Sequence, residues 1–382
     1  MSSRPLRVCF FGTYREEYSR NRILIDGLRC AGVEVIECHE RLWHGIEDRV
    51  QAASGGWLNP AFAWRLLRTY LRLLRWHARM GDYDALVIGY PGQLDVFLGR
   101  ILSWRRRKPM AWDIFMSIYL ISIERGLDKR SPLTIQLLGF FERLACTLPD
   151  LLILDTREYV AWFQAVHHLS SDKFRLVPTG ADDQVYHPVS IQQADGGIFR
   201  VVYYGTFIPN HGVETIVRAA HILAGEHGIQ FEMIGNGPDQ EMAQNLARDL
   251  GLTNITFIDW MPETDLVMRI AQSDVCLGAF GTTPQSIMTV QNKIYSSLAM
   301  AKPVITGDSP AIRQAFKDKE HLLVCERANP ESLAAAIKSL ELDPDLRNRL
   351  GQNGYALFTS GYTTAKLGAL YKNHLEGMVR AK

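Results

Sequence analysis

Short apolar runs recur along the chain, and longer stretches with helical spacing separate them. Six lie in the first half, at residues 8–11, 33–36, 85–88, 110–112, 151–154 and 174–177. Six more lie in the second half, at residues 201–204, 231–234, 255–258, 275–277, 303–305 and 322–324. Continuous apolar runs between helices are typical of parallel strands covered on both faces. The pattern pauses near residue 188 and begins again, which predicts two successive α/β domains.

We therefore expect two doubly wound, Rossmann-like domains that face one another across a cleft, over residues 1–188 and 189–361. Ligand sites in such folds lie at the carboxyl ends of the strands. The polar, glycine-bearing stretch after Pro188 suits a hinge. The helix pattern over residues 362–382 follows the last element of the second domain, and we expect it to pack back on the first.

Composition narrows the classes of protein further. The chain has 382 residues, of which 47% are hydrophobic and 22% charged, so it can bury a core and is not a disordered chain. A net charge of +1 argues against a general nucleic-acid binder. The six cysteines show no CxxC pair and no metal-ligand spacing, which suits a reducing cytoplasm and predicts no metal site.

The sequence carries no pattern of a signal peptide and no apolar stretch of the roughly 18 to 20 residues that a membrane-spanning helix needs. We expect a cytoplasmic protein that is neither exported by that route nor integral to a membrane.

Two glycine-bearing turns follow predicted strands and precede helices. Gly12 and Thr13 close the first strand, and a glycine there lets a ligand approach the backbone while helix-start amides hold a phosphate. The dinucleotide fingerprint GxGxxG is absent, so a plain tight turn is the alternative. The turn at residues 235–238 leaves the same choice between a structural turn and a ligand loop.

Two charged side chains are candidates for chemistry. Lys293 lies in the first turns of a predicted helix among uncharged neighbours, and it either neutralises a departing diphosphate or is simply solvated. Asp113 follows the strand at residues 110–112. It either projects into the cleft as a catalytic carboxylate or caps a helix that begins at Ile114.

A basic helix is predicted between Asp48 and Asp82, a window without any acidic residue. Five arginines form one stripe on it: Arg65, Arg68, Arg72, Arg75 and Arg79. An apolar flank lies away from this stripe and consists of Leu67, Leu71, Leu74 and Ala78. The pattern favours docking on anionic lipid headgroups. A solvated face over the sheet and a patch for RNA are the alternatives.

The second half of the chain resembles family 4 of the retaining GT-B glycosyltransferases. The resemblance covers about residues 175–360 and rests on an ordered series of segments: VPTGADDQVYHP at 177–188, YYGTFIPNHGVETIVRAA at 203–220, FEMIGNGPDQEMAQNLARDLGL at 231–252, ITFIDWMPETDL at 255–266, SDVCLGAF at 273–280 and NKIYSSLAMAKPVIT at 292–306. The first half shares only its strand–helix order and Gly12.

The resemblance implies transfer of a sugar from a nucleoside diphosphate donor with retention of configuration, with no metal and no other cofactor. It also implies a set of donor-binding residues: Gly12, Thr13, Gly205, Thr206, His211, Gly235, Asn236, Gly237, Trp260, Met261, Asn292, Lys293 and Ser296. Lys293 and Asp113 are the catalytic candidates.

This sequence departs from the family in its charges. The two glutamates that many members carry correspond here to Met288 and Ser296. The family's arginine and lysine in the first loop of the second domain correspond to Thr206 and His211. The phosphate clamp would then depend on Lys293 and His211.

We expect a glycosyltransferase that docks on the inner face of a membrane and extends a lipid-linked sugar in cell-envelope glycan assembly. Its partners would be a nucleotide-sugar and an anionic membrane surface, with no nucleic acid. The alternatives are a nucleotide-binding scaffold that has lost catalysis, a sugar-nucleotide epimerase, and a transferase that acts on a soluble small molecule.

Overall fold

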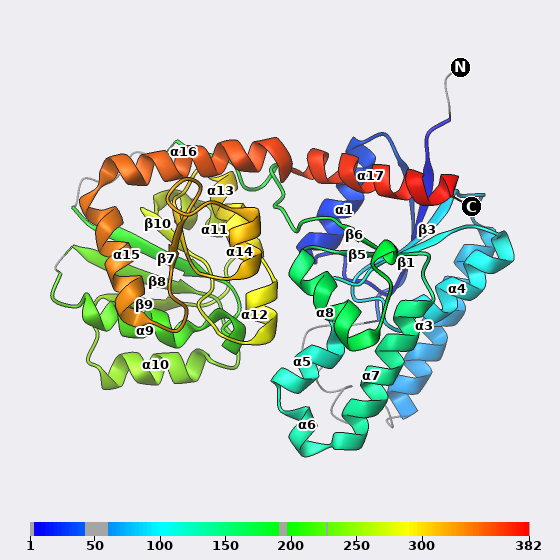
Figure 1. Cartoon of the computed structure of the whole chain (residues 1–382), viewed down its shortest axis with the longest axis horizontal. Coiled ribbons are helices and arrows are strands. Elements are labelled where there is room, and N and C mark those ends of the chain that lie inside the picture. The colour runs from blue at the N-terminus through cyan, green and yellow to red at the C-terminus, as the bar shows by residue number, and fades with distance from the viewer. Residues whose placement is uncertain (1–3, 43–59, 191–196, 227, 382) are drawn as a thin grey trace. The chain divides into compact units, whose positions relative to one another are not determined.

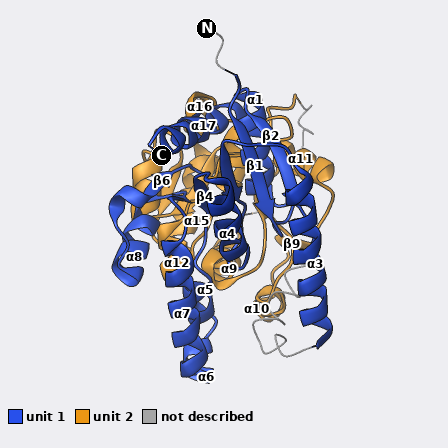
Figure 2. Cartoon of the chain, turned by 90° about the vertical axis from the view of Figure 1, so that its right-hand side faces the viewer, with its two compact units in different colours: residues 1–178, 364–382 blue, residues 179–363 orange. Residues whose placement is uncertain are grey.

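The computed structural model describes residues 4–42, 60–190, 197–226 and 228–381 (Figure 1). The chain forms two compact units (Figure 2). Unit 1 consists of residues 1–178 with 364–382, and unit 2 consists of residues 179–363. The boundary expected at residue 188 therefore falls inside unit 2. Most of the expected hinge stretch, residues 191–196, lies outside the described residues.

A six-stranded parallel sheet forms the centre of unit 1, in the order β2-β1-β3-β4-β5-β6. Its strands are β1 (Arg7–Gly12), β2 (Glu34–His39), β3 (Ala85–Ile88), β4 (Met110–Asp113), β5 (Leu151–Leu154) and β6 (Phe174–Leu176). Its helices are α1 (Ser19–Cys30), α3 (Pro60–Arg79), α4 (Asp95–Arg106), α5 (Ile118–Glu124), α6 (Leu127–Arg130), α7 (Pro132–Thr147), α8 (Arg157–His167) and α17 (Thr364–Arg380).

A second six-stranded parallel sheet forms the centre of unit 2, in the order β12-β11-β10-β7-β8-β9. Its strands are β7 (Phe199–Tyr204), β8 (Ile229–Ile234), β9 (Ile255–Ile258), β10 (Val275–Leu277), β11 (Val304–Gly307) and β12 (Leu323–Cys325). Its helices are α9 (Val213–Ile222), α10 (Gln240–Asp249), α11 (Glu263–Gln272), α12 (Pro284–Met288), α13 (Asn292–Ala299), α14 (Pro310–Ala315), α15 (Pro330–Leu342) and α16 (Pro344–Gly361). Each of the twelve predicted apolar runs overlaps a strand.

Alternation along β7 shows why the runs are continuously apolar. Val201 and Tyr203 join the core that α9, α10 and α15 cover. Val202 and Tyr204 point the other way, into the core that α11, α13 and α14 cover. Because successive side chains of a strand face opposite sides of the sheet, a sheet with helices on both sides needs apolar residues at every position.

The order of the strands reverses once in each sheet. In unit 1 the chain leaves β1 for β2 on one side and returns to β3 on the other, and in unit 2 β7 lies between β8 and β10. Crevices at such reversal points, beyond the carboxyl ends of the strands, are where open α/β sheets bind ligands. The loops after β1, β3, β7 and β10 are therefore the candidate ligand-binding loops of the two sheets.

Helix α17 completes the core of unit 1 although it is the last helix of the chain (Figure 1). Leu367, Tyr371 and Leu375 are buried in the same core as side chains of α1. The two helices approach so closely at Gly27 and Gly368 that a Cβ atom on Gly368 would overlap the carbonyl group of Gly27. Glycine at both positions is what permits this contact.

We expect Gly368→Ala to lower the free energy of unfolding of unit 1 by about 1–3 kcal/mol, because the added methyl group must push the helices apart. Thermal unfolding followed by circular dichroism measures the effect. Gly377→Ala is the matched control on the same helix, since nothing lies within 4 Å of its added Cβ. The control should be neutral or slightly stabilising, and equal melting temperatures for the two variants would contradict the packing argument.

Candidate functional site

Two glycine-bearing loops pack backbone to backbone beyond the carboxyl ends of β7 and β8. Gly205 and Gly235 have φ angles of 138° and 126°, which favour glycine. A Cβ atom on Gly235 would overlap the carbonyl oxygen of Gly205, and one on Gly237 would overlap the backbone of Phe207. The amide of Phe207 donates to the carbonyl of Asn236 at 2.8 Å. This packing accounts for the glycines at 235 and 237, and it places both loops side by side.

Lys293 reaches this edge of the sheet from the first turn of α13. Its Nζ lies 3.8 Å from the centroid of the Tyr203 ring and 3.3 Å from Nδ1 of His211. A Cβ atom on Gly205 would lie 2.9 Å from the same Nζ. The side chain is only 6% exposed, and within the described part of the chain no carboxylate forms an ion pair with it. Burial lowers the pKa of Lys293 well below its usual value.

His211 is fixed by the loop that follows β7. Its Nδ1 lies 2.6 Å from the carbonyl oxygen of Thr206 and 2.9 Å from the hydroxyl of Tyr203. Burial and the nearby Lys293 together lower the pKa of His211 well below its usual value. The ring is therefore neutral, and the cluster contains one nitrogen that can become cationic, on Lys293. The structure thus brings together Gly205, Thr206, His211 and Lys293.

The amino-terminal end of α13 has no side-chain cap. Gln291 occupies the position before the helix, and its side chain makes no capping hydrogen bond there. Uncapped amides at a helix start attract anions. Ser296, one turn further on, is buried and bonds to the Tyr204 hydroxyl at 2.8 Å and to the carbonyl of Asn292 at 3.1 Å. Its hydroxyl therefore serves the packing of α13, whereas Asn292 and Lys293 lie in the first turn.

Trp260 and Asn236 form a separate contact beyond β8 and β9. The indole Nε1 donates to Oδ1 of Asn236 at 2.7 Å, and the Trp260 side chain is 48% exposed. Met261 packs partly against the core instead. An exposed ring held by a hydrogen bond at its edge offers a flat apolar face on which a ligand ring could stack.

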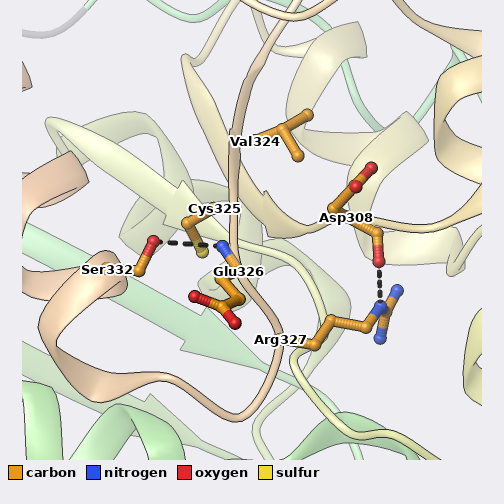
Figure 3. A pocket seen from close by; sticks show the side chains of 6 residues that line it. All are labelled: Asp308, Val324, Cys325, Glu326, Arg327 and Ser332. Atoms are coloured by element: carbon orange, nitrogen blue, oxygen red, sulfur yellow. Dashed lines mark hydrogen bonds between the residues drawn. The ribbon is translucent and has the colours of Figure 1, made fainter.

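Arg327 is a half-buried cation of unit 2 that the sequence did not single out. It borders a pocket of 480 Å³ together with Asp308, Val324, Cys325, Glu326 and Ser332 (Figure 3). Its Nε donates to the carbonyl of Asp308 at 2.5 Å, and another guanidinium nitrogen donates to the carbonyl of Gly281 at 2.7 Å. Burial lowers the pKa of Arg327 to about 10. These bonds connect the loops after β10 and β11, so Arg327 has a supporting role. No sequence motif indicates this role.

The structure gives Gly12 and Thr13 a role other than phosphate binding. The amide and hydroxyl of Thr13 donate to the carboxylate of Asp95, at 2.8 Å for the amide. A Cβ atom on Gly12 would lie 2.5 Å from that carboxylate, and the Tyr70 hydroxyl also donates to it at 2.7 Å. The Thr13 amide is thus bonded to Asp95, and glycine is needed at position 12 to admit that carboxylate.

Asp113 is fully buried and does not project into a site. Its carboxylate accepts hydrogen bonds from the equally buried guanidinium of Arg20, at 2.7 Å from Nη2. Burial raises the pKa of Asp113, and Arg20 opposes that rise. The capping alternative does not hold either, because the next helix, α5, begins at Ile118 and is capped by Ser117. A buried arginine in α1 is the partner that the sequence pattern did not reveal.

The basic helix α3 is formed as predicted, but its leucines do not face the core. Its buried positions are Phe62, Thr69, Leu73 and His77. The expected apolar flank is exposed, and Leu67, Leu71 and Leu74 are 51%, 42% and 36% accessible. The arginine stripe lies beside this exposed flank. Arg72 pairs with Glu40 at 3.5 Å.

Across the described residues, no helix is both long and apolar enough to cross a bilayer.

Sequence comparison finds known proteins that are similar to unit 2. Residues 191–357, which cover most of unit 2, match the family model of glycosyl transferases group 1. Unit 2 is thus similar to the glycosyl transferases group 1 domain over most of its length. The lipopolysaccharide core biosynthesis glycosyltransferase LpsE of Rhizobium meliloti is 25% identical over 172 residues, which are 45% of this chain and 48% of LpsE. The chain thus spans about half the length of that relative.

Solved glycosyltransferase structures share the fold of the whole chain. Sucrose-phosphate synthase from Thermosynechococcus elongatus superimposes with a TM-score of 0.74 and 16% identity, over 99% of this chain and all of that one. Anabaena HepE in complex with UDP-glucose gives a TM-score of 0.68 and 13% identity, over 98% of this chain and 99% of that one. The chain therefore has the GT-B fold.

Because Asp113 and Arg20 form a buried pair, we expect Asp113→Ala to lower the stability of unit 1 by about 3–5 kcal/mol. The uncompensated guanidinium of Arg20 is the physical reason. The melting temperature of unit 1 is the measurement, and Asp26→Ala, which removes an exposed ion pair with Arg29, should change it little. The double variant Arg20→Met with Asp113→Leu should recover part of the loss. Unchanged stability with lost activity in Asp113→Ala would instead point to a role in chemistry.

Proposed function

We propose that this protein is a retaining glycosyltransferase that moves a sugar from a nucleoside diphosphate sugar to a lipid-linked acceptor in cell-envelope glycan assembly. The observation that carries the proposal is the buried, unpaired Lys293 at the uncapped start of α13 in a group 1 domain. A buried cation without a counter-charge is suited to a ligand that brings negative charge with it.

In the proposed reaction, the diphosphate of the donor lies against Lys293 and the amides at the start of α13. The bond between the anomeric carbon and the diphosphate oxygen breaks, and the acceptor oxygen bonds to that carbon on the same face. The acceptor proton passes to an oxygen of the departing diphosphate. Lys293 and the helix amides stabilise the charge that develops on the leaving group, and no metal is required.

The loops around this position suit the remaining parts of a nucleotide. Asn236 and the exposed ring of Trp260 would lie against the base, and Asn292 would contact the ribose or phosphate. The complex of HepE with UDP-glucose supports a nucleotide-sugar as the donor. The name of LpsE supports an acceptor in lipopolysaccharide assembly.

Helix α3 supports the proposal of a membrane-associated acceptor. Arg68, Arg75 and Arg79 are exposed and have no ion-pair partner among the described residues. They lie beside the exposed leucines and Trp64, which is 66% accessible. Basic side chains next to exposed Trp and Leu are typical of helices that lie in the headgroup region of anionic membranes. We propose that α3 docks the protein on such a surface.

Binding of UDP should depend on Lys293 and take up a proton. In the empty site the pKa of Lys293 is lowered by burial, and a bound diphosphate raises it again, so affinity should fall as the pH rises between these two pKa values. Calorimetry in Tris and in HEPES at one pH measures the proton uptake. Lys293→Met should weaken UDP binding, abolish the uptake and lower sugar transfer about 10²-fold.

Lys317→Met is the control, because Lys317 is an exposed lysine of the same unit, 71% accessible in its side chain. It should bind UDP and take up protons as the wild type does. Uptake that persists in Lys293→Met would assign the proton to His211. Unchanged UDP affinity in Lys293→Met would remove Lys293 from the site, and UDP binding without transfer to any acceptor would favour the catalytically inactive scaffold.

Docking by α3 should be electrostatic. Replacing Arg68, Arg75 and Arg79 by Gln should lower affinity for phosphatidylglycerol-containing vesicles by about two orders of magnitude, at about 1 kcal/mol per cation. Co-sedimentation at low and high salt checks this, because salt screens exposed charges. The control replaces Arg248 and Arg313, two cations of unit 2. Equal vesicle binding by the α3 variant and the wild type would contradict docking through α3.

A further inference from the structure

Helix α7 of unit 1 exposes a continuous apolar stripe that the proposed reaction does not use. Leu133, Leu137, Phe140 and Leu144 are 69%, 61%, 67% and 42% accessible. Their spacing of four, three and four residues places all of them on one face of the helix. Single exposed apolar side chains are ordinary, but four large ones in one row mark a surface that contacts something else.

The opposite face of α7 is firmly anchored, so the stripe is not the result of a loosely packed helix. Glu142 is completely buried and accepts hydrogen bonds from the Ser117 hydroxyl and the Ile118 amide, and it contacts His167 at 3.0 Å. Phe141 packs against Phe97 of α4, with ring centroids 4.8 Å apart. These contacts fix the rotation of α7 and hold the stripe outward.

The exposed charged residues of α6 and α7 are positive, and the one acidic residue of α6, Asp128, is half-buried. Lys129 and Arg130 lie in α6, directly before α7, and Arg143 lies on α7 itself. All three are exposed and form no ion pair with any described residue. The single acidic residue of α7 is the buried Glu142, so the exposed surface of the helix carries no negative charge. An apolar row bordered by free cations is complementary to a bilayer with anionic headgroups.

Helices α3 and α7 project from the same end of unit 1, and each begins at that end (Figure 2). The exposed Trp64 and Leu67 lie in the first half of α3, and Leu133 and Leu137 lie in the first half of α7. Helices α3 and α7 therefore carry exposed apolar side chains and cations toward the same end of unit 1.

We propose that α7 is a second lipid-docking element of unit 1, whose leucines and phenylalanine insert among the acyl chains of an anionic bilayer. The arginines of α3 supply attraction that salt screens, whereas the stripe of α7 supplies apolar burial that salt does not screen. The inference extends the docking proposed for α3, and it does not depend on glycosyl transfer.

The test uses the full chain with Leu137→Gln and Phe140→Gln combined. Binding is measured by co-sedimentation with phosphatidylcholine vesicles that contain phosphatidylglycerol, at low and at high salt. The double variant should lose at least about tenfold in affinity at both salt concentrations, because two large apolar side chains no longer enter the membrane. The control is Leu342→Gln in unit 2, where the leucine is 68% exposed, and it should bind as the wild type does.

The α7 variant must also melt at the wild-type temperature, since both replaced side chains are exposed. Wild-type affinity of this variant at both salt concentrations would overturn the role of α7 while leaving that of α3 intact. Failure of the wild type itself to bind vesicles would overturn both. Sedimentation equilibrium adds a further outcome: a wild-type dimer that α7 substitution converts to monomer, with vesicle binding unchanged, would mean that a second copy covers the stripe.

Discussion

The buried amino group of Lys293 imposes the main constraint on unit 2. Removing an ammonium group from water costs several kcal/mol unless an opposite charge or an aromatic face offsets the loss. Here the face of Tyr203 and the neutral ring of His211 offset only part of it. Burial therefore disfavours the charged form of Lys293 and lowers its pKa. The close-packed glycine loops place Gly205 directly beside Lys293.

Unit 1 uses its polar side chains differently. At the reversal point of its sheet, Asp95 at the start of α4 accepts hydrogen bonds from Thr13 in the loop after β1, and Asp113 at the end of β4 is paired with Arg20. Both carboxylates are buried and bonded, so they define the shape of this edge and leave no free charge there. Among the described residues, the exposed surface of unit 1 carries the apolar and basic side chains of α3 and α7.

The strands could be predicted from a local pattern. Short apolar runs that alternate with helical segments are typical of strands in a sheet that is covered on both faces. The side-chain partners could not be predicted, because they are far apart in the sequence. Arg20 lies 93 residues from Asp113 and 157 residues from Val177. The same limit applies to α3, whose apolar flank at Leu67, Leu71 and Leu74 is exposed and does not form its contact with the core. The buried stripe instead includes Thr69 and His77, and His77 is accommodated by its contact with the Tyr83 hydroxyl. Lys293 could be singled out as a candidate site residue because an isolated lysine among uncharged neighbours is visible in the local sequence.

The chain passes from unit 1 to unit 2 after residue 178 and returns after residue 363. Unit 2 is thus a single uninterrupted segment, whereas unit 1 is assembled from both ends of the polypeptide. During translation, α1 leaves the ribosome more than 330 residues before the side chains that cover it, Leu367, Tyr371 and Leu375. The first unit to begin synthesis is therefore the last to complete its core, and until then the nascent chain carries an uncovered apolar helix.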